Sequence, residues 1–217
     1  MTFKAIIFDC DGVIVDTESI ANHIMQSKLA QLGLVLSDQY VQAEFTGYTT
    51  DHNLEKIKAL LTRELPPSFK EDYKADFQAA IAKHLDPIQG IPELLDNLRP
   101  LVAMATNAQR QEMEFKLAKI GLTSVFNQRF CVNDVTHAKP SPEIYLLAAE
   151  SLQVSAKDCL VIEDSPAGIQ AGVRAGMTVY AYSEKMDKEK QLKAGASKCF
   201  DSMKALRHHL NQLHLYY

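Results

Sequence analysis

The chain has 217 residues, of which 47% are hydrophobic and 23% are charged, a balance typical of a globular protein with a sizeable apolar core. The length is enough for one large domain, or for one domain with a small insertion. The formal net charge of −4 argues against a nucleic-acid-binding protein, and no apolar run approaches the ~20 residues that a membrane-spanning helix needs.

The first predicted element is a short buried strand, Ala5–Phe8, and two acidic residues follow it directly. Side chains alternate between the two faces of a strand, so Asp9 and Asp11 leave the strand end on the same side. Two carboxylates that approach each other repel unless a cation or a proton lies between them. The pair therefore predicts a Mg²⁺ site that contains a nucleophile, with an ordinary Asp-Gly turn as the alternative interpretation.

The segment 16–88 contains helical periodicity and no convincing strand. Apolar residues recur at helical spacing over Ile20–Leu32, Leu54–Leu61 and Phe69–Ile81. Thr50 or Asp51 is the expected N-cap of the second stretch. A helical block inserted after the first strand predicts a cap domain that acts as a lid over a water-excluding site. The alternative is that these helices pack on the sheet as part of one domain.

After residue 88, short apolar runs alternate with helical patterns, which is typical of a parallel sheet wrapped by helices. The predicted strands are Leu101–Ala105, Arg129–Cys131, Cys159–Ile162 and Thr178–Tyr182. Helices are expected over Met113–Ile120, from Pro142 with Ile144, Leu147 and Ala148 facing inward, from Pro166, and over Met203–Leu215. The predicted fold class is α/β, with a Rossmann-like core formed by residues 1–15 and 89–217 and an all-helical cap formed by residues 16–88.

Polar residues of three further kinds lie at the predicted strand ends or just before helices. Thr106 and Asn107 close the second strand, Lys139 precedes a helix, and Glu163-Asp164 closes the fourth strand. Each has a simpler interpretation, since the threonine could be a helix cap, the lysine a solvated loop cation and the acids a capping pair. In an open parallel sheet, however, the carboxyl ends of the strands share one crevice in which ligands bind.

In the order and type of these residues, the chain resembles the haloacid dehalogenase superfamily, in the branch with a helical cap after the first strand. The first motif of that family, Asp-x-Asp-Gly, matches Asp9–Gly12, and its second matches Thr106. Its third motif, a lysine before a helix, matches Lys139, and its acidic fourth matches Glu163 and Asp164. The resemblance covers nearly the whole chain.

The resemblance implies a Mg²⁺-dependent phosphatase. Asp9 would be the nucleophile that forms an aspartyl-phosphate, and Asp11 would protonate the leaving alkoxide and later deprotonate water. Thr106 and the backbone N–H of Asn107 would hold the phosphoryl oxygens, and Lys139 would neutralise nucleophile and phosphate together. The implied metal ligands are Asp9, Asp11 through its backbone carbonyl, Glu163 directly or through water, and Asp164.

The acid at position 11 favours phosphoryl transfer over dehalogenation, because a halide needs no proton to leave. The sequence also resembles β-phosphoglucomutases, but Ala21 stands where that enzyme type has a histidine, and Thr50 where it has an arginine. These departures favour a phosphatase similar to hexose-phosphate and 6-phosphogluconate phosphatases, with the mutase as the alternative. Substrate choice is expected to lie in the cap, where Glu18, Gly47 and Thr50 would face a sugar phosphate or a phosphorylated sugar acid.

Two non-enzymatic alternatives are weaker. In a phosphorylated receiver module the acidic pair ends the first strand and the accepting aspartate ends the third, whereas here Glu163-Asp164 ends the fourth predicted strand. A silent phosphate-binding protein on the same fold would be expected to lack a motif carboxylate, and none is missing.

The expected partner is a small-molecule phosphate ester, without nucleic acid or membrane, and the chain is expected to act as a monomer. The first predicted strand begins so early that it leaves no room for a signal peptide. The cysteines are far apart in sequence and are interpreted as buried reduced thiols: Cys10, Cys131, Cys159 and Cys199. A cytoplasmic location is therefore expected.

Overall fold

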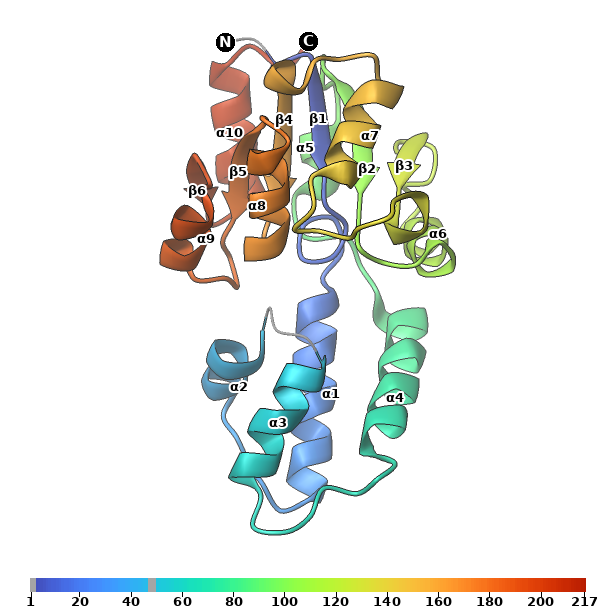
Figure 1. The fold of residues 1–217 in the computed structure, drawn as a ribbon, viewed down its shortest axis with the longest axis vertical. Helices are drawn as coiled ribbons and strands as arrows, with labels where there is room; N and C mark the ends of the chain where they lie inside the picture. Colours follow the sequence, from blue (N-terminus) through green and yellow to red (C-terminus); the bar gives the residue numbers. More distant parts are fainter. Residues whose placement is uncertain (1–2, 47–49) are drawn as a thin grey trace. The chain divides into compact units, whose positions relative to one another are not determined.

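The computed structural model describes residues 3–46 and 50–217. These residues form two compact units, which Figure 1 shows as ribbons. The first unit consists of the described residues up to Asp16 together with Asp86–Tyr217, and the second is Thr17–Leu85. The assignment of residues 1–15 and 89–217 to a core domain, and of 16–88 to a cap domain, remains a prediction.

A six-stranded parallel sheet lies at the centre of the first unit, in the order β3-β2-β1-β4-β5-β6. Its strands are β1 Ala5–Phe8, β2 Leu101–Ala105, β3 Gln128–Phe130, β4 Cys159–Glu163, β5 Thr178–Tyr182 and β6 Lys198–Phe200. β1 and β4 are buried along their whole length, because helices cover both faces of a parallel sheet. The strand order reverses between β1 and β4, so the ligand crevice of such a sheet is expected at their carboxyl ends.

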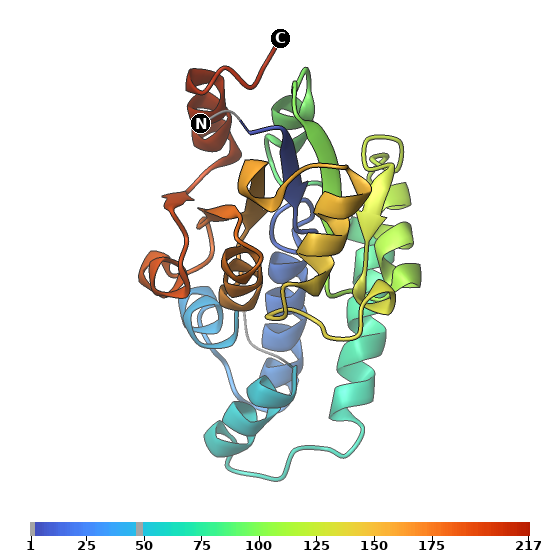
Figure 2. The ribbon, with the colours of Figure 1, turned by 45° about the horizontal axis from the view of Figure 1, so that its top comes forward.

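Helices follow the strands of this unit and cover the sheet. They are α5 Ile91–Leu95, α6 Arg110–Lys119, α7 Glu143–Ser151, α8 Pro166–Arg174, α9 Lys188–Ala194 and α10 Met203–Gln212, with 3₁₀ turns at Val132–Asp134 and Ala156–Asp158. α7 and α8 lie over one face (Figures 1 and 2), where their apolar residues pack against alternate strand residues such as Ile7 and Val161. Phe8 is directed to the other face, and its ring packs edge-on against Phe126 with centroids 5.9 Å apart. The predicted α/β fold class is confirmed.

The structure also corrects details of the sequence analysis. It adds the edge strand β6 and the helices α5 and α9, which the periodicity did not predict. The buried face of α7 consists of Ile144, Tyr145, Ala148 and Ala149, while Leu147 is only half-buried. The last helix ends at Gln212, earlier than predicted.

The second unit is helical in its described part, as expected. Its elements are α1 Thr17–Gln31, α2 Asp38–Phe45, α3 Thr50–Leu60 and α4 Phe69–His84, and α1 and α4 lie side by side (Figures 1 and 2). The helices enclose a core of their own: Met25, Leu29, Val41, Phe45, Leu54, Ile57 and Phe69. α2 was not predicted. The expected N-caps Thr50 and Asp51 are wrong, because both residues lie inside α3.

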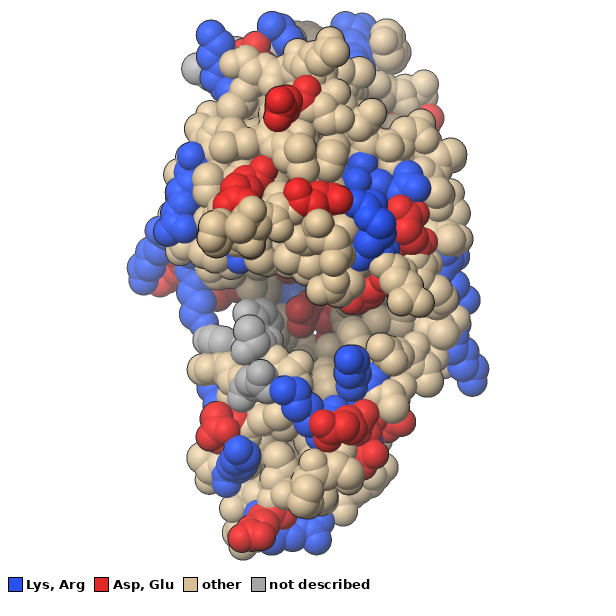
Figure 3. All heavy atoms as spheres, turned by 45° about the vertical axis from the view of Figure 1, so that its right-hand side comes forward, with Lys and Arg blue, Asp and Glu red and all other residues tan. Residues whose placement is uncertain are grey.

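Acidic and basic side chains are interspersed over the face of each unit that Figure 3 shows, without a continuous basic surface. None of the helices in the described residues combines the length and apolar character needed to cross a membrane. All four cysteines are free thiols, and Cys10, Cys131 and Cys159 are buried.

Candidate active site

The ammonium group of Lys139 joins the carboxyl ends of three neighbouring strands. Its Nζ donates to Asp9 Oδ1 at 2.5 Å, to the carbonyl oxygen of Ala105 at 2.8 Å and to Glu163 Oε1 at 3.0 Å. These three partners lie at the ends of β1, β2 and β4. Lys139, Asp9 and Glu163 are all buried, so the interpretation of Lys139 as a solvated loop cation is wrong.

Glu163 is held by hydrogen bonds at both carboxylate oxygens. Besides Lys139, its Oε1 accepts from the hydroxyl of Tyr145 at 3.3 Å, and its Oε2 accepts from the backbone N–H and hydroxyl of Ser165 at 2.6 and 3.0 Å. The Tyr145 ring also lies 4.6 Å from Lys139 Nζ, within range of a cation–π interaction. Ser165 is itself the N-cap of α8, through its bond from Gly168. With both oxygens occupied, Glu163 is placed to orient Lys139.

Two glycines make room for the acidic pair at the end of β4. A Cβ atom on Gly168 would lie 1.5 Å from Glu163 Oε1, and one on Gly12 would lie 2.1 Å from Asp164 Oδ2. Gly12 also has φ +77°, a conformation that favours glycine. On its backbone side, the carbonyl of Asp164 accepts from Gln191 Nε2 at 2.7 Å, so α9 supports this residue.

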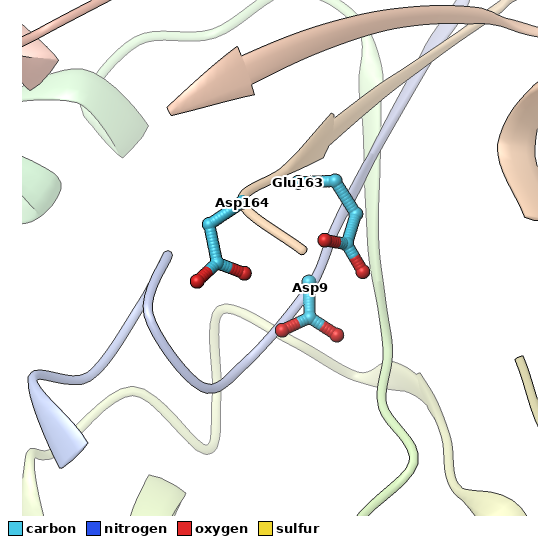
Figure 4. A group of neighbouring side chains, drawn as sticks. All are labelled: Asp9, Glu163 and Asp164. Atoms are coloured by element: carbon cyan, nitrogen blue, oxygen red, sulfur yellow. The ribbon is translucent and has the colours of Figure 1, made fainter. Parts of the chain in front are cut away.

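The carboxylates of Asp9, Glu163 and Asp164 converge at the ends of β1 and β4, as Figure 4 shows. One oxygen of each lies within 4.8 Å of the others, and all three residues are buried. Oxygen atoms of carboxylates are the ligands that Mg²⁺ prefers in proteins. The donor chemistry therefore fits a magnesium ion, and Gly12 and Gly168 leave the space that the Asp164 and Glu163 carboxylates occupy.

Burial raises the pKa of Asp9 to about 7, with Lys139 opposing the shift and the negative charges of Glu163 and Asp11 adding to it. For Lys139, burial acts to lower the pKa, but the negative charges of Asp9 and Glu163 outweigh it and raise the pKa well above its ordinary value. The lysine is therefore a permanent cation. Because one ammonium group does not fully offset the burial of these acids, a further cation is favourable here.

Thr106 and Asn107 directly follow β2, whose last residue, Ala105, accepts a hydrogen bond from Lys139 through its carbonyl oxygen. The buried Thr106 donates its backbone N–H to Phe130, and its hydroxyl oxygen accepts from the N–H of Ala108 at 3.0 Å. It is not a helix cap, since α6 is preceded by Gln109. The side chain of Asn107 pairs with the backbone of Lys139, accepting its N–H at 3.0 Å and donating to its carbonyl at 3.2 Å. The amide thereby anchors the segment that carries the lysine.

Asp11 is bound to a lysine that the sequence analysis did not single out. The ammonium group of Lys116, on α6, lies 2.5 Å from Asp11 Oδ1. Lys116 lies three residues after Met113 and next to Leu117, on the buried face of that helix. A lysine on the apolar face of a predicted helix is unusual, and this feature of the sequence could have identified Lys116. No feature of the sequence pattern marked Tyr145 or Gln191 as residues that support the site.

The three cap residues predicted to contact substrate belong in sequence to the second unit, Thr17–Leu85. Glu18 and Thr50 belong to α1 and α3 of the second unit, while Gly47 lies outside the described residues. The structure thus brings together Asp9, Lys139, Glu163 and Asp164, places Asp11, Thr106 and Asn107 beside them, and leaves the roles of the cap residues as predictions.

Residues 6–182 match the family model described as haloacid dehalogenase-like hydrolase. The chain is 26% identical to the 6-phosphogluconate phosphatase of Escherichia coli K12 over 82% of either chain. It is 32% identical to the fructose-1-phosphate phosphatase of the same organism, over 81% of this chain and 94% of that protein. A solved hydrolase of the same family from Deinococcus radiodurans R1, with bound phosphate and sodium, superposes with a TM-score of 0.89 at 31% identity, covering 99% and 97% of the two chains.

Proposed function

This chain belongs to the haloacid dehalogenase-like hydrolase family and is a phosphatase, and we propose that it hydrolyses phosphate monoesters of small sugars or sugar acids. The proposal includes Mg²⁺ as cofactor and an aspartyl-phosphate intermediate. One observation carries it: Asp9 is buried at the end of β1, 2.5 Å from Lys139, with carboxylate oxygens of Glu163 and Asp164 within 4.8 Å. A nucleophile, a fixed cation and ligands for a metal are thereby in one place.

In the first half of the reaction, a carboxylate oxygen of Asp9 attacks phosphorus and the bond to the leaving alkoxide breaks. Asp11 gives its proton to that alkoxide. Lys139 neutralises the charge that builds up between nucleophile and phosphate, and its three fixed partners keep it oriented throughout. The Thr106 hydroxyl and the backbone N–H of Asn107 hold the phosphoryl oxygens.

In the second half, water attacks the aspartyl-phosphate, and Asp11 takes up the proton that the water releases. The bond between phosphorus and Asp9 breaks, so the carboxylate is regenerated and inorganic phosphate leaves. Mg²⁺, held by Asp9, Asp164 and the backbone carbonyl of Asp11, would supply positive charge against the phosphoryl oxygens. Because the Glu163 oxygens are occupied by hydrogen bonds, its contribution to the metal is through water or through Lys139.

The helical unit is assigned the choice of substrate, with Glu18, Gly47 and Thr50 as the residues that face the sugar. This part of the proposal rests on the sequence and on the two sugar-phosphate phosphatases that the chain resembles. A small-molecule substrate, a monomeric protein and a cytoplasmic location belong to the same proposal, and the free cysteines support the location.

A panel of phosphate esters tests the function directly. With Mg²⁺ present, the chain is expected to release inorganic phosphate fastest from hexose phosphates or phosphorylated sugar acids, and addition of EDTA is expected to stop the release. Nucleoside monophosphates serve as controls of similar charge. Conversion of a sugar 1-phosphate into its 6-phosphate isomer, primed by a bisphosphate, would instead identify a mutase. A uniform absence of turnover would contradict the proposal.

Mg²⁺ binding is expected to weaken about tenfold for each pH unit below 7, because the metal binds Asp9 without its proton. The folded-state pKa of Asp9, about 7, lies above the ordinary value of 3.8. Its contribution to the stability of the metal-free protein is therefore present below pH 3.8 and is lost as the pH rises through 7. Bound Mg²⁺ is expected to stabilise the protein in the pH range where the metal-free protein loses this contribution from Asp9.

Thermal unfolding with and without Mg²⁺ at several pH values between about 5 and 8.5 measures this effect. The increase in Tm should be small at the acidic end and reach a plateau above pH 7. Asp9→Asn provides the control, because a variant without the titrating group should show no such trend. A Tm increase that is the same at every pH in the wild-type protein would contradict the assignment of Asp9 as a ligand.

A further inference from the structure

Lys116 is an ammonium group in the core that the reaction described above does not use. Only 1% of its surface is exposed, and its Nζ contacts Asp11 Oδ1 and Glu112 Oε1, each at 2.5 Å. A buried charge is costly unless it is paired and hydrogen-bonded, so these two carboxylates account for its presence there. Glu112 lies one turn earlier on the same helix. Asp11 lies in the loop after β1, so its contact ties α6 to the candidate active site.

The path of that loop is held by its own backbone hydrogen bonds. The carbonyl of Cys10 accepts from the N–H groups of Ile14 and Val15 at 2.8 and 3.0 Å, and the N–H of Gly12 donates to Val15 at 2.9 Å. The contact with Lys116 therefore acts on the side chain of Asp11. About a third of that side chain is exposed (34%), against 2% for Lys116. The lysine thus holds the carboxylate from the protein side and restricts its rotation.

The two acids of the first motif each have a lysine of their own. Lys139 pairs with Asp9, the proposed nucleophile, and Lys116 pairs with Asp11, the proposed acid and base. In the proposed reaction Asp11 takes up a proton from the water that attacks the aspartyl-phosphate, and this step requires the Asp11 carboxylate to be correctly oriented.

We propose that Lys116 is a positioning residue for the second half of the reaction, a proposal that rests on the function proposed above. It holds the Asp11 carboxylate in the orientation from which that group takes a proton from the attacking water. In this step the water oxygen bonds to phosphorus, the bond between phosphorus and the Asp9 oxygen breaks, and the proton passes to Asp11. Lys116 acts only through Asp11.

The test is Lys116→Met, which keeps most of the length of the side chain and removes its charge, with p-nitrophenyl phosphate and Mg²⁺ as the probe. Release of p-nitrophenolate needs little help from an acid, so formation of the aspartyl-phosphate should proceed normally. Its hydrolysis should slow about 100-fold, because a misplaced catalytic group costs roughly that factor. We expect kcat and KM to fall together with kcat/KM unchanged, and rapid mixing to show a burst of one p-nitrophenolate per protein.

Three further variants sharpen the result. Lys119→Met, at an exposed position of the same helix, should match the wild-type protein. Lys116→Arg keeps the charge and should recover most of kcat. Circular dichroism checks folding, and Lys116→Gln replaces the methionine variant if that one does not fold, with the same burst expected.

The outcomes separate this inference from the proposed function. If the wild-type protein hydrolyses the probe and Lys116→Met keeps its kcat, the inference fails and the function stands. It also fails if kcat/KM falls as much as kcat without a burst, because Lys116 then supports the whole site. If the wild-type protein does not hydrolyse any phosphate ester, the proposed function itself fails.

Discussion

Replacing Asp9 with asparagine is expected to lower phosphate-ester turnover by about 10⁴-fold or more while leaving a folded protein. An amide oxygen is a poor nucleophile and cannot form the acyl phosphate on which the proposed reaction depends. The replacement is nearly the same size, and Lys139 keeps its contacts with Glu163 at 3.0 Å and with the Ala105 carbonyl at 2.8 Å. The fold should therefore tolerate the change.

Steady-state release of inorganic phosphate measures this loss, and thermal unfolding verifies the fold. Asp96→Asn removes a carboxylate at an exposed position after α5 and serves as the matched control. The first variant should be inactive and the second unchanged. Substantial turnover in purified Asp9→Asn would overturn the assignment of the nucleophile.

Lys139→Met is the second large effect that we expect, and it concerns stability as well as activity. The change leaves two buried carboxylates, Asp9 and Glu163, without their shared cation. Breaking a buried ion pair from one side typically costs about 3–5 kcal/mol, so the free energy of unfolding should fall by that amount at pH 8. With Mg²⁺ present, turnover should also fall strongly relative to the wild-type protein, since the ammonium group that neutralises nucleophile and phosphate together is gone.

The loss of stability should be smaller at pH 5, because a carboxyl group without its cation can bind a proton there. Burial already raises the pKa of Asp9 to about 7, and removal of the lysine acts in the same direction. Denaturant unfolding at both pH values measures the difference, with the exposed Lys119→Met as the control. Equal losses at pH 5 and pH 8 would contradict the idea that unpaired charge is the cause.

Most of the sheet could be predicted because its central strands are continuous apolar runs. β1, β2 and β5 match their predicted limits, and β4 extends one residue further, to Glu163. β6 could not be predicted from its pattern, since this edge strand is only three residues long and begins with the exposed Lys198. Short edge strands lie partly in solvent, so their sequences lack the apolar run that identifies a buried strand.

The site could be predicted as far as its members follow strands directly. That rule places Asp9, Thr106 and Glu163 near one another, because parallel strands end at a common edge, and the family resemblance then implied their roles. Lys116 could not be found in the same way, since a lysine on a helix is usually solvated and the Asp11 contact spans 105 positions in sequence. The Asn107 amide was interpreted only through its backbone, because its pairing with Lys139 depends on how two loops meet.

The close packing of carboxylates against Gly12 and Gly168 affects how favourably this site would bind a metal ion. The carboxylates of Asp164 and Glu163 lie where the Cβ atoms of any other residues at these two positions would be. These side chains have little freedom to rotate even before a cation arrives. An incoming ion would meet oxygens that are already aligned, so its capture would cost little conformational entropy.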